Sequence, residues 1–328
     1  MSVDERAMAI ADAAVAGTAP TRDDVIYLLQ FDGYSVEAAY VEARAREIAM
    51  ESAQGVATIH AQIGVDANPC PMNCQYCSFA QVNEGVCTDD AELPLDTIVT
   101  YAKMFDERGV HLISLMSTAG LSPSRYLEIV SAVRDAISDD MPILANTGDM
   151  GIEYARKLKD AGATAAYHAV RMGEGTYTDI DPGRRRRTIA NIREVGLALM
   201  TGVEPLWEGC DVEELADRLC EIPGFDPYCT GACGLTSTKG TVLAHKGMRA
   251  PKTGLVRYIG ALSRLVCGYD VRFGGVGGAI WVDAGTDPRN RNYGSSAEAI
   301  EHDIRRARRT LEKDGWRVPA RPDMSWFE

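Results

Sequence analysis

The chain has 328 residues, of which 46% are hydrophobic and 25% are charged, as is usual for a globular protein with one large domain or two small ones. Its formal net charge of −13 at pH 7 argues against nucleic acid as a partner, because binding to phosphates needs clustered Lys and Arg. No run of about 18 apolar residues is present, so we expect neither a transmembrane helix nor a membrane partner.

Helical periodicity dominates the first fifty residues. Apolar residues recur at helical spacing over Asp4–Ala16, after Thr21, and over about Ser35–Glu51. Thr21 is a suitable N-cap for the middle helix, with the acidic Asp23 in its first turn. We therefore expect an N-terminal helical segment over residues 1–55.

Beyond residue 57, short β-rich runs alternate with amphipathic helical patterns. This alternation predicts βαβ units and a parallel sheet, and about eight strands over some 240 residues suit a (β/α) barrel of the TIM type, complete or partly open. We expect this barrel, with a C-terminal helix, to occupy residues 56–328. The strand candidates are Thr58–Val65, Leu112–Ser117, Pro142–Asn146, Thr164–Val170, Leu197–Val203, Tyr228–Leu235, Asp270–Gly274 and Ala279–Val282.

A doubly wound open sheet is the alternative architecture, and it would place a Gly-rich phosphate turn after the first strand. That turn carries cysteines instead. The later glycine-rich run Gly274–Gly278 precedes a strand-like segment rather than a helix. We therefore interpret it as a close backbone approach at the barrel rim rather than as a phosphate site.

Three cysteines follow the first predicted strand directly. Cys70, Cys74 and Cys77 have the spacing C-x3-C-x2-C, with the aromatic Tyr76 just before the last one. A cubane iron–sulfur cluster normally takes four Cys ligands, so three leave one iron open to an outside ligand. In a (β/α) barrel the chemistry lies at the C-terminal ends of the strands, which is where this loop falls.

Zinc and disulfide chemistry are the alternatives for the same cysteines. Zinc would need a fourth ligand, and the nearest candidates, His60 and Cys87, lie at unusual spacings. A disulfide framework would imply secretion, whereas the chain has an odd number of cysteines, nine, and we expect no signal peptide. Free thiols and an oxygen-sensitive cluster together favour a reducing cytoplasm.

The cysteine loop with its aromatic residue resembles the signature of the radical S-adenosylmethionine (radical SAM) enzymes. Within that superfamily the chain is most similar, over about residues 20–290, to the group of biotin synthase, the related hydrogenase-maturation enzyme and 3-methylornithine synthase. Lys239–Ala244 resembles the Lys-Gly-Thr-Pro-Leu-Ala stretch of biotin synthase, with Val in place of Pro, and Tyr167-His168 takes the place of that family's Asn-His. The resemblance implies a 4Fe–4S cluster, S-adenosylmethionine, and an electron donor such as flavodoxin or ferredoxin. One electron would cleave the bound sulfonium, and the resulting radical would abstract hydrogen from a small-molecule substrate.

The same resemblance assigns the cofactor contacts position by position. It makes the three cysteines the iron ligands and places Tyr76 against the adenine. Ser117, at the end of the second strand, is expected to contact the methionine amino group, although a Ser at this point needs no such role.

Four more candidates for cofactor contacts lie in or after the fourth strand. Arg171 and Glu174 compete for one polar contact, which for Glu174 would be the ribose hydroxyls. Arg185 matches an arginine that pairs with the methionine carboxylate, a task that suits the planar guanidinium fork, but any of Arg184–Arg187 could point inward. His168 is expected to face the cavity, and its other interpretation is a satisfied core histidine.

The chain differs from biotin synthase at the positions that hold the second iron–sulfur cluster of that enzyme. By the resemblance, the three cysteines that hold it there correspond to Met116, Leu144 and Met200 here, so we do not expect the usual biotin synthase reaction. Cys229 and Cys233 lie four apart on the sixth strand and, by alternation, on one face, so they could begin an unusual second cluster. Simple packing of buried cysteines is the other interpretation.

Two acidic residues are the candidates for substrate binding. Glu204 follows the fifth strand, and Asp283 closes the last one beside a turn rich in Asp, Gly and Pro.

Taken together, the cysteine loop and the resemblance predict a radical SAM enzyme that abstracts hydrogen from a small metabolite, leading to rearrangement in cofactor or amino-acid biosynthesis. Sulfur insertion of the biotin synthase or lipoyl synthase type, and a non-catalytic zinc or cluster-binding scaffold, are the alternatives.

Overall fold

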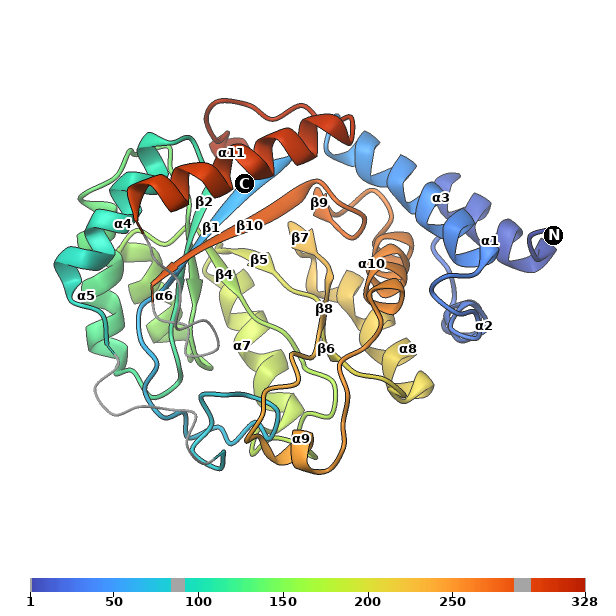
Figure 1. Ribbon diagram of the computed structural model, residues 1–328, viewed down its shortest axis with the longest axis horizontal. Coiled ribbons are helices and arrows are strands. Elements are labelled where there is room, and N and C mark those ends of the chain that lie inside the picture. Colours follow the sequence, from blue (N-terminus) through green and yellow to red (C-terminus); the bar gives the residue numbers. More distant parts are fainter. Residues whose placement is uncertain (1, 84–91, 286–295, 328) are drawn as a thin grey trace.

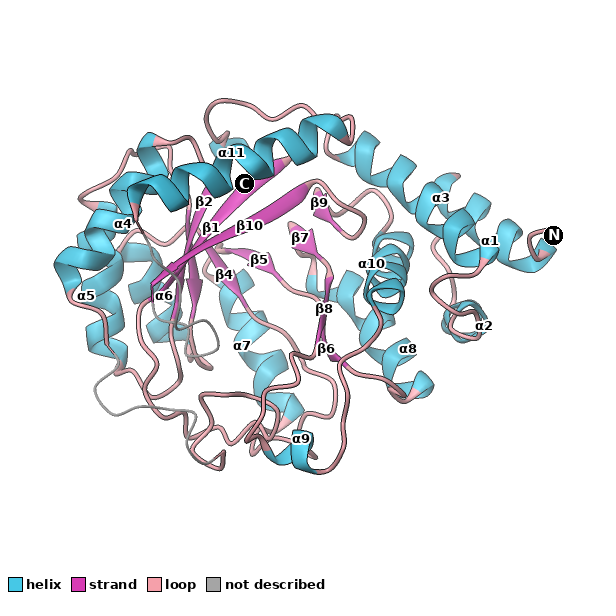
Figure 2. Cartoon of the chain, viewed as in Figure 1, coloured by secondary structure: helices cyan, strands magenta, loops and turns pink. Residues whose placement is uncertain are grey.

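The computed structural model describes residues 2–83, 92–285 and 296–327 (Figure 1). Eight parallel strands form a curved sheet in the order β10-β1-β2-β3-β4-β5-β7-β9, and helices surround it (Figure 2). Because β10 and β9 are the two edges of the sheet, the barrel is partly open. The predicted (β/α) barrel is confirmed.

The elements follow one another as strand and helix along most of the chain. The strands are β1 Thr58–Gly64, β2 Leu112–Met116, β3 Ile143–Asn146, β4 Ala165–Tyr167, β5 Ala198–Met200, β6 Val203–Leu206, β7 Cys229–Thr230, β8 Ala232–Gly234, β9 Phe273–Gly274 and β10 Ala279–Gly285. The helices are α1 Glu5–Val15, α2 Arg22–Leu28, α3 Val36–Ser52, α4 Leu95–Glu107, α5 Pro123–Arg134, α6 Ile152–Asp160, α7 Pro182–Glu194, α8 Val212–Glu221, α9 Val242–His245, α10 Thr253–Cys267 and α11 Ala297–Lys313.

The alternation of side chains along β1 separates the core from the barrel interior. Ile59, Ala61 and Ile63 are fully buried in the main hydrophobic cluster, to which the surrounding helices also contribute. His60 and Gln62, on the other face, line a cavity inside the barrel. The strand thus contributes to packing on one side and to the site on the other.

Two of the predicted strands are each broken in two. The fifth candidate divides into β5 and β6, and the sixth into β7 and β8; β6 and β8 pair as a separate two-stranded sheet. The breaks occur at Gly202 and Gly231, where a Cβ on Gly202 would lie 2.7 Å from the carbonyl oxygen of Gly231. Two backbones this close leave no room for side chains, so both strands bend out of the main sheet together.

The glycine-rich run after β9 is a close backbone approach, as predicted. A Cβ on Gly274 would lie 1.8 Å from the carbonyl oxygen of Thr230, and the residue has φ +89°. The fully buried Arg264 of α10 supports this edge by donating to the carbonyl oxygens of Gly274 (2.8 Å) and Val271.

The three predicted N-terminal helices are present as α1, α2 and α3. Thr21 caps α2 and forms a capping box with Asp24. The buried residues of these helices belong to one cluster with those of α8 and α10, so they pack against the side of the barrel (Figure 1). A domain boundary at residues 55 and 56 stays a prediction.

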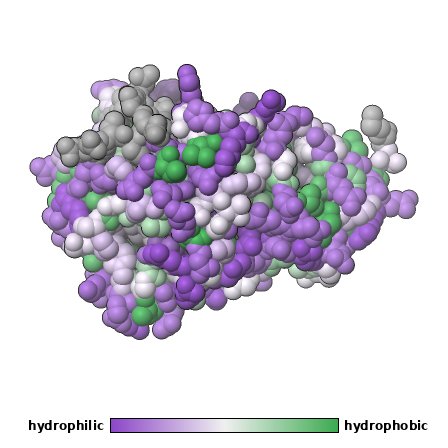
Figure 3. All heavy atoms as spheres, turned by 90° about the horizontal axis from the view of Figure 1, so that it is seen from below, coloured by the Kyte–Doolittle hydropathy of each residue, from purple (hydrophilic) through white to green (hydrophobic). Residues whose placement is uncertain are grey.

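The surface is polar over the face drawn in Figure 3, where apolar residues form separate small areas. None of the described helices combines the length and the apolar character that a membrane span requires.

Candidate active site

A cavity of about 730 Å³ occupies the barrel interior, and its lining includes residues at the C-terminal ends of the strands and in the loops that follow them. Each of the eight strands of the main sheet contributes at least one lining residue, and the cysteine loop after β1 forms part of the wall. This is the position at which (β/α) barrels carry their chemistry.

All three cysteines of the loop line this cavity. Cys74 is buried, and Cys70 and Cys77 are half-buried. Backbone hydrogen bonds close the loop, from the Cys70 N–H to the Phe79 carbonyl (2.7 Å) and from the Cys77 N–H to the Cys74 carbonyl (2.8 Å). The local fold therefore brings the three thiols to one wall.

Asn83 ties the cysteine loop to a distant segment. Its side-chain amide donates to the carbonyl oxygens of Cys74 (3.2 Å) and Cys77 (2.6 Å), and its amide oxygen accepts the N–H of Val242 (2.8 Å). Val242 begins α9 within Lys239–Ala244, the stretch that resembles biotin synthase. That stretch thus lies directly against the cysteine loop.

These donors fit a cluster that takes one thiolate on each of three irons. Burial raises the pKa of Cys74 to about 11, so this thiol keeps its proton until a metal displaces it. Of the two candidates for a fourth zinc ligand, His60 is hydrogen-bonded to Thr58 (2.9 Å) and Cys87 falls outside the described residues. Within the described ranges no three His, Cys, Asp or Glu side chains are grouped around a position for a single metal ion.

Tyr76 lines the cavity beside the cysteines, as the resemblance implies. Its hydroxyl is buried and has no hydrogen-bond partner among the described residues, and burial raises the pKa of Tyr76 well above its ordinary value. An unpaired buried hydroxyl is costly, so this atom is suited to a contact with a bound molecule.

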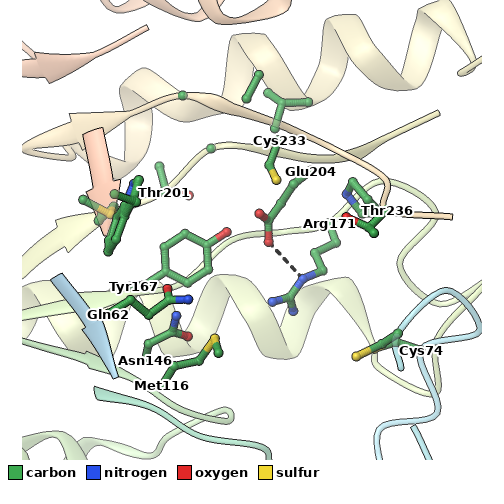
Figure 4. A pocket seen from close by; sticks show the side chains of 18 of the residues that line it. Gln62, Cys74, Met116, Asn146, Tyr167, Arg171, Thr201, Glu204, Cys233 and Thr236 are labelled. Atoms are coloured by element: carbon green, nitrogen blue, oxygen red, sulfur yellow. Dashed lines mark hydrogen bonds and ion pairs between the residues drawn. The ribbon is translucent and has the colours of Figure 1, made fainter. Parts of the chain in front are cut away.

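Arg171 and Glu204 form an ion pair across the cavity. The Arg171 Nε lies 3.2 Å from Glu204 Oε1, and both side chains point into the space beside Tyr167, with Cys74 on one side and Gln62 on the other (Figure 4). Glu174 accepts the Arg171 backbone N–H (2.9 Å) but is not among the described residues that line the cavity. Of the two competing residues, Arg171 is therefore the one that reaches the site.

Arg185 is the arginine of its run that points inward. Its side chain is 5% exposed and lines the cavity, whereas those of Arg184 and Arg187 are 53% and 70% exposed. Its Nε donates to Glu174 (3.2 Å) and its NH1 to Asp149 (3.1 Å). These two carboxylates hold the guanidinium in one orientation.

The expectation that His168 faces the cavity is not met, because His168 lies behind the wall and is not among the described lining residues. Its Nε2 is 2.9 Å from Asp149 Oδ1, and burial lowers the pKa of His168 to about 4, so the ring is neutral at neutral pH. Burial alone would raise the pKa of Asp149, but the hydrogen bond from His168 and the charge of Arg185 hold it well below its ordinary value. His168 thus acts on the site through Asp149 and Arg185.

Ser117 lies in the wall at the end of β2, and its hydroxyl donates to Thr147 (3.0 Å). Next to it, Asp66 accepts the backbone N–H and the hydroxyl of Thr118, each at 2.8 Å. This carboxylate joins the start of the cysteine loop to the end of β2. Asp283, on β10, also lines the cavity.

Sulfur-bearing side chains line the cavity in two sets. Met116 and Met200 lie there together with Leu144, the three positions that correspond to the second-cluster cysteines of biotin synthase. Cys229 and Cys233 also line the cavity, as their alternation predicted, even though the strand breaks between them. Cys210, Cys220 and Cys267 are not among the described lining residues.

Several residues of the site were not singled out from the sequence as functional: Asp149, Asn83, Asp66, Gln62 and Trp281. The period-two alternation of β1 and β10 could have identified Gln62 and Trp281 as facing inward. Nothing local marks Asp149, because its partner Arg185 lies 36 residues away along the chain. Asn83 bonds locally to Cys74 and Cys77, but its link to Val242 spans 159 residues.

Comparison with known proteins finds similarities that include the cysteine loop. The family model described as Radical SAM superfamily matches residues 67–219, which include the cysteine loop and Arg185. The biotin synthase of Nostoc punctiforme is 25% identical over 218 residues, 64% of each chain, and that of Herminiimonas arsenicoxydans is 28% identical over 171 residues, 51% of this chain and 50% of the relative.

The match to the family model covers somewhat less than half of the chain, and it fits the radical SAM superfamily together with the biotin synthase relatives. Members of that superfamily use a 4Fe–4S cluster and S-adenosylmethionine. The chain spans somewhat less than two thirds of the length of the first of these relatives and about half of the second.

Two solved structures share the fold over almost the whole chain. Methylornithine synthase (PylB) has a TM-score of 0.78 at 17% identity, covering 97% of this chain and 98% of that one. The FeFe-hydrogenase maturase HydG from Carboxydothermus hydrogenoformans has a TM-score of 0.72 at 17% identity, covering 98% and 81%. At these identities the likeness concerns the fold.

Proposed function

We propose that this protein is a radical SAM enzyme that reductively cleaves S-adenosylmethionine at a 4Fe–4S cluster and abstracts hydrogen from a small metabolite, leading to rearrangement. One observation carries the proposal: the three cysteines of a single loop, Tyr76 and Arg185 line the same interior cavity at the C-terminal ends of the strands. Cofactor or amino-acid biosynthesis is the proposed setting.

The cysteine loop would hold the cluster through Cys70, Cys74 and Cys77, and its open iron would supply the one-electron cleavage of the sulfonium. Arg185 offers a guanidinium already oriented by Asp149 and Glu174, which suits the planar carboxylate of the methionine moiety.

Tyr76 offers an aromatic ring for the adenine. The barrel wall would surround much of a molecule bound in the cavity and so limit the access of water to the reacting groups.

Rearrangement is favoured over sulfur insertion by the three positions that correspond to second-cluster cysteines. Met116, Leu144 and Met200 line the cavity, and none of them can supply a thiolate. Sulfur insertion is the second candidate, because the thiols of Cys229 and Cys233 line the same cavity.

The decisive experiment is anaerobic reconstitution followed by iron and sulfide analysis and by assay of 5′-deoxyadenosine with a chemical reductant. About four irons per chain and 5′-deoxyadenosine formation support the proposal, and about eight irons support sulfur insertion. A Cys74→Ala variant should lose both iron and activity, whereas Cys220→Ala, outside the cavity, should keep them. Tightly bound zinc without cleavage would refute the proposal in favour of a scaffold.

Two features of the setting follow from the same chemistry. The reaction needs a one-electron donor of the flavodoxin or ferredoxin class. No disulfide joins any two of the described cysteines, which suits a reducing compartment, and we propose the cytoplasm.

A further inference from the structure

One segment of this acidic protein is basic. The chain carries 47 Asp and Glu and a formal net charge of −13, yet its sequence contains no acidic residue between Asp226 and Asp270. Within that interval, the segment of α9 and its flanking loops exposes four basic side chains: Lys239, Lys246, Arg249 and Lys252.

The protein itself leaves these four charges uncompensated. In the described ranges none of the four forms an ion pair with a carboxylate. Lys246 Nζ contacts the neutral side-chain oxygen of Gln75 (3.2 Å), whereas Arg257, just beyond the segment, is paired with Glu42 (3.2 Å). The segment therefore presents positive charge to the solvent.

The basic segment lies directly on the cysteine loop, and both are found at the lower side of the molecule in Figure 1. The N–H of Leu243 donates to the carbonyl oxygen of Gln75 (3.1 Å), a residue between the second and third cysteines of the loop. Val82 of the same loop is a large apolar side chain that is 43% exposed, and Asn83 beside it accepts the N–H of Val242 (2.8 Å). We call the four basic residues together with Val82 the α9 surface.

The position and charge of the α9 surface suit a redox partner. Electron transfer slows steeply with distance, so a protein that reduces a cluster on the cysteine loop must come close to that loop. Because the chain as a whole is strongly acidic, an acidic partner is repelled by most of the molecule and attracted to this basic surface. An exposed apolar side chain among the charges adds a contact that excludes water.

Two exposed acids lie at the margin of this region. The N–H of Glu208 donates to the carbonyl oxygen of Arg249 (3.1 Å), and the carboxylate of Asp179 accepts from Asn73 of the cysteine loop (2.7 Å). Like charges at a margin restrict the orientations in which an acidic protein can dock.

We propose that the α9 surface is the docking site of an acidic one-electron donor protein, which reduces the cluster on the cysteine loop from there. The redox centre of the donor is oxidised by one electron and the cluster is reduced by the same electron, so no further reactant is needed. This inference rests on the proposed function and adds to it the place where the donor binds and the charge of that donor.

The probe for this surface is the hydroquinone of a flavodoxin, an acidic flavoprotein, mixed anaerobically with the reconstituted holoprotein. Stopped-flow absorbance follows reduction of the cluster. Photoreduced deazaflavin, which is small and uncharged, is the reference reductant because it needs no docking surface. Reduction by flavodoxin should slow about tenfold or more between low salt and about 0.5 M salt, whereas reduction by deazaflavin should not change.

A pair of charge reversals locates the docking site. Arg249→Glu/Lys252→Glu should slow reduction by flavodoxin about tenfold or more at low salt, and this difference from the wild type should shrink as salt is added. The matched control is Arg309→Glu/Lys313→Glu, which makes the same change in net charge on exposed residues of α11, at the opposite side of the molecule in Figure 1. Its rate should stay within about twofold of the wild-type rate.

The inference is overturned if flavodoxin reduces the α9-surface variant as fast as the α11 control, or if flavodoxin does not reduce a cluster that deazaflavin reduces. It is also overturned if the α9-surface variant loses binding of a DNA or RNA oligonucleotide while its reduction by flavodoxin is unchanged, because the surface would then serve a nucleic acid.

Cleavage of S-adenosylmethionine by the deazaflavin-reduced protein is measured separately. Cleavage together with a flavodoxin rate that does not depend on the α9 surface would reject the docking site alone. Absence of cleavage, with a flavodoxin rate that does depend on the α9 surface, would reject the proposed radical chemistry and leave the docking site standing.

Discussion

Replacement of Asn83 should release the cysteine loop while leaving every cysteine in place. Asn83→Ala removes two hydrogen bonds to the carbonyl oxygens of Cys74 and Cys77 and a third to the N–H of Val242, at 3.2, 2.6 and 2.8 Å. At about 1 kcal/mol for each hydrogen bond, the loss is about 3 kcal/mol. Since 1.4 kcal/mol is a factor of ten, the open form of the loop should be about 100-fold more populated.

The rate at which a chelator removes iron from the anaerobic holoprotein measures this effect. We expect the rate for Asn83→Ala to rise at least tenfold, because the cluster itself holds the loop closed and offsets part of the loss. Asn83→Asp keeps the acceptor for Val242 but turns a carboxylate toward two carbonyl oxygens, so it should lose iron at least as fast as Asn83→Ala.

Gln81→Ala is the matched control for this prediction. Gln81 is exposed on the same loop, and its side chain makes one long contact, 3.5 Å, to the carbonyl oxygen of Pro69. If Asn83→Ala releases iron within twofold of the Gln81→Ala rate, Asn83 does not hold the loop and the reasoning is refuted.

Three further predictions concern binding of the cofactor, stability at acidic pH and the close backbone approach at the barrel edge. Arg185→Met should weaken S-adenosylmethionine binding, measured by equilibrium dialysis, about tenfold or more, whereas Arg187→Met at the surface should not; equal affinities would remove Arg185 from the site. Burial lowers the pKa of His60, His111 and His168 to between about 3 and about 4. Between pH 6.5 and 4 the unfolded chain therefore binds protons that the folded chain does not. Their contribution to stability is complete above that range and is lost as the pH falls through it, so the unfolding temperature should drop from pH 7 to pH 5; a constant value would contradict this. Gly274→Ala should lower the unfolding temperature far more than Gly268→Ala, because both positions have positive φ but only Gly274 lies against another backbone; similar effects would refute the close approach as the cause.

The barrel and its cysteine loop could be predicted because both depend on local pattern. Alternation of strand and helix sets the parallel sheet, and the spacing of the cysteines places them on one loop. The resemblance singled out Arg185 but left open which residue of Arg184–Arg187 points inward, and the burial of Arg185 distinguishes it from its exposed neighbours Arg184 and Arg187. The breaks at Gly202 and Gly231 could not be foreseen, because they depend on two backbones that meet only in the folded chain.

The residues that orient the side chains of the site could not be predicted from the sequence for the same reason. Asp149 occurs in an ordinary Thr-Gly-Asp loop, and only the fold brings His168 and Arg185 to its carboxylate. His168 was expected to touch the cavity because it ends a strand, but that carboxylate attracts the ring to a position behind the wall. Arg264 shows the opposite case, a charged residue in a helix that is fully buried because backbone carbonyls satisfy it.

The most direct test of the central claim, an iron left open by a three-cysteine loop, is the electron paramagnetic resonance spectrum of the reduced cluster with and without S-adenosylmethionine. The account predicts a 4Fe–4S signal that changes when S-adenosylmethionine binds, and that is absent from Cys70→Ala, Cys74→Ala and Cys77→Ala variants. A signal that S-adenosylmethionine leaves unchanged, with a fourth protein ligand on the last iron, would contradict it.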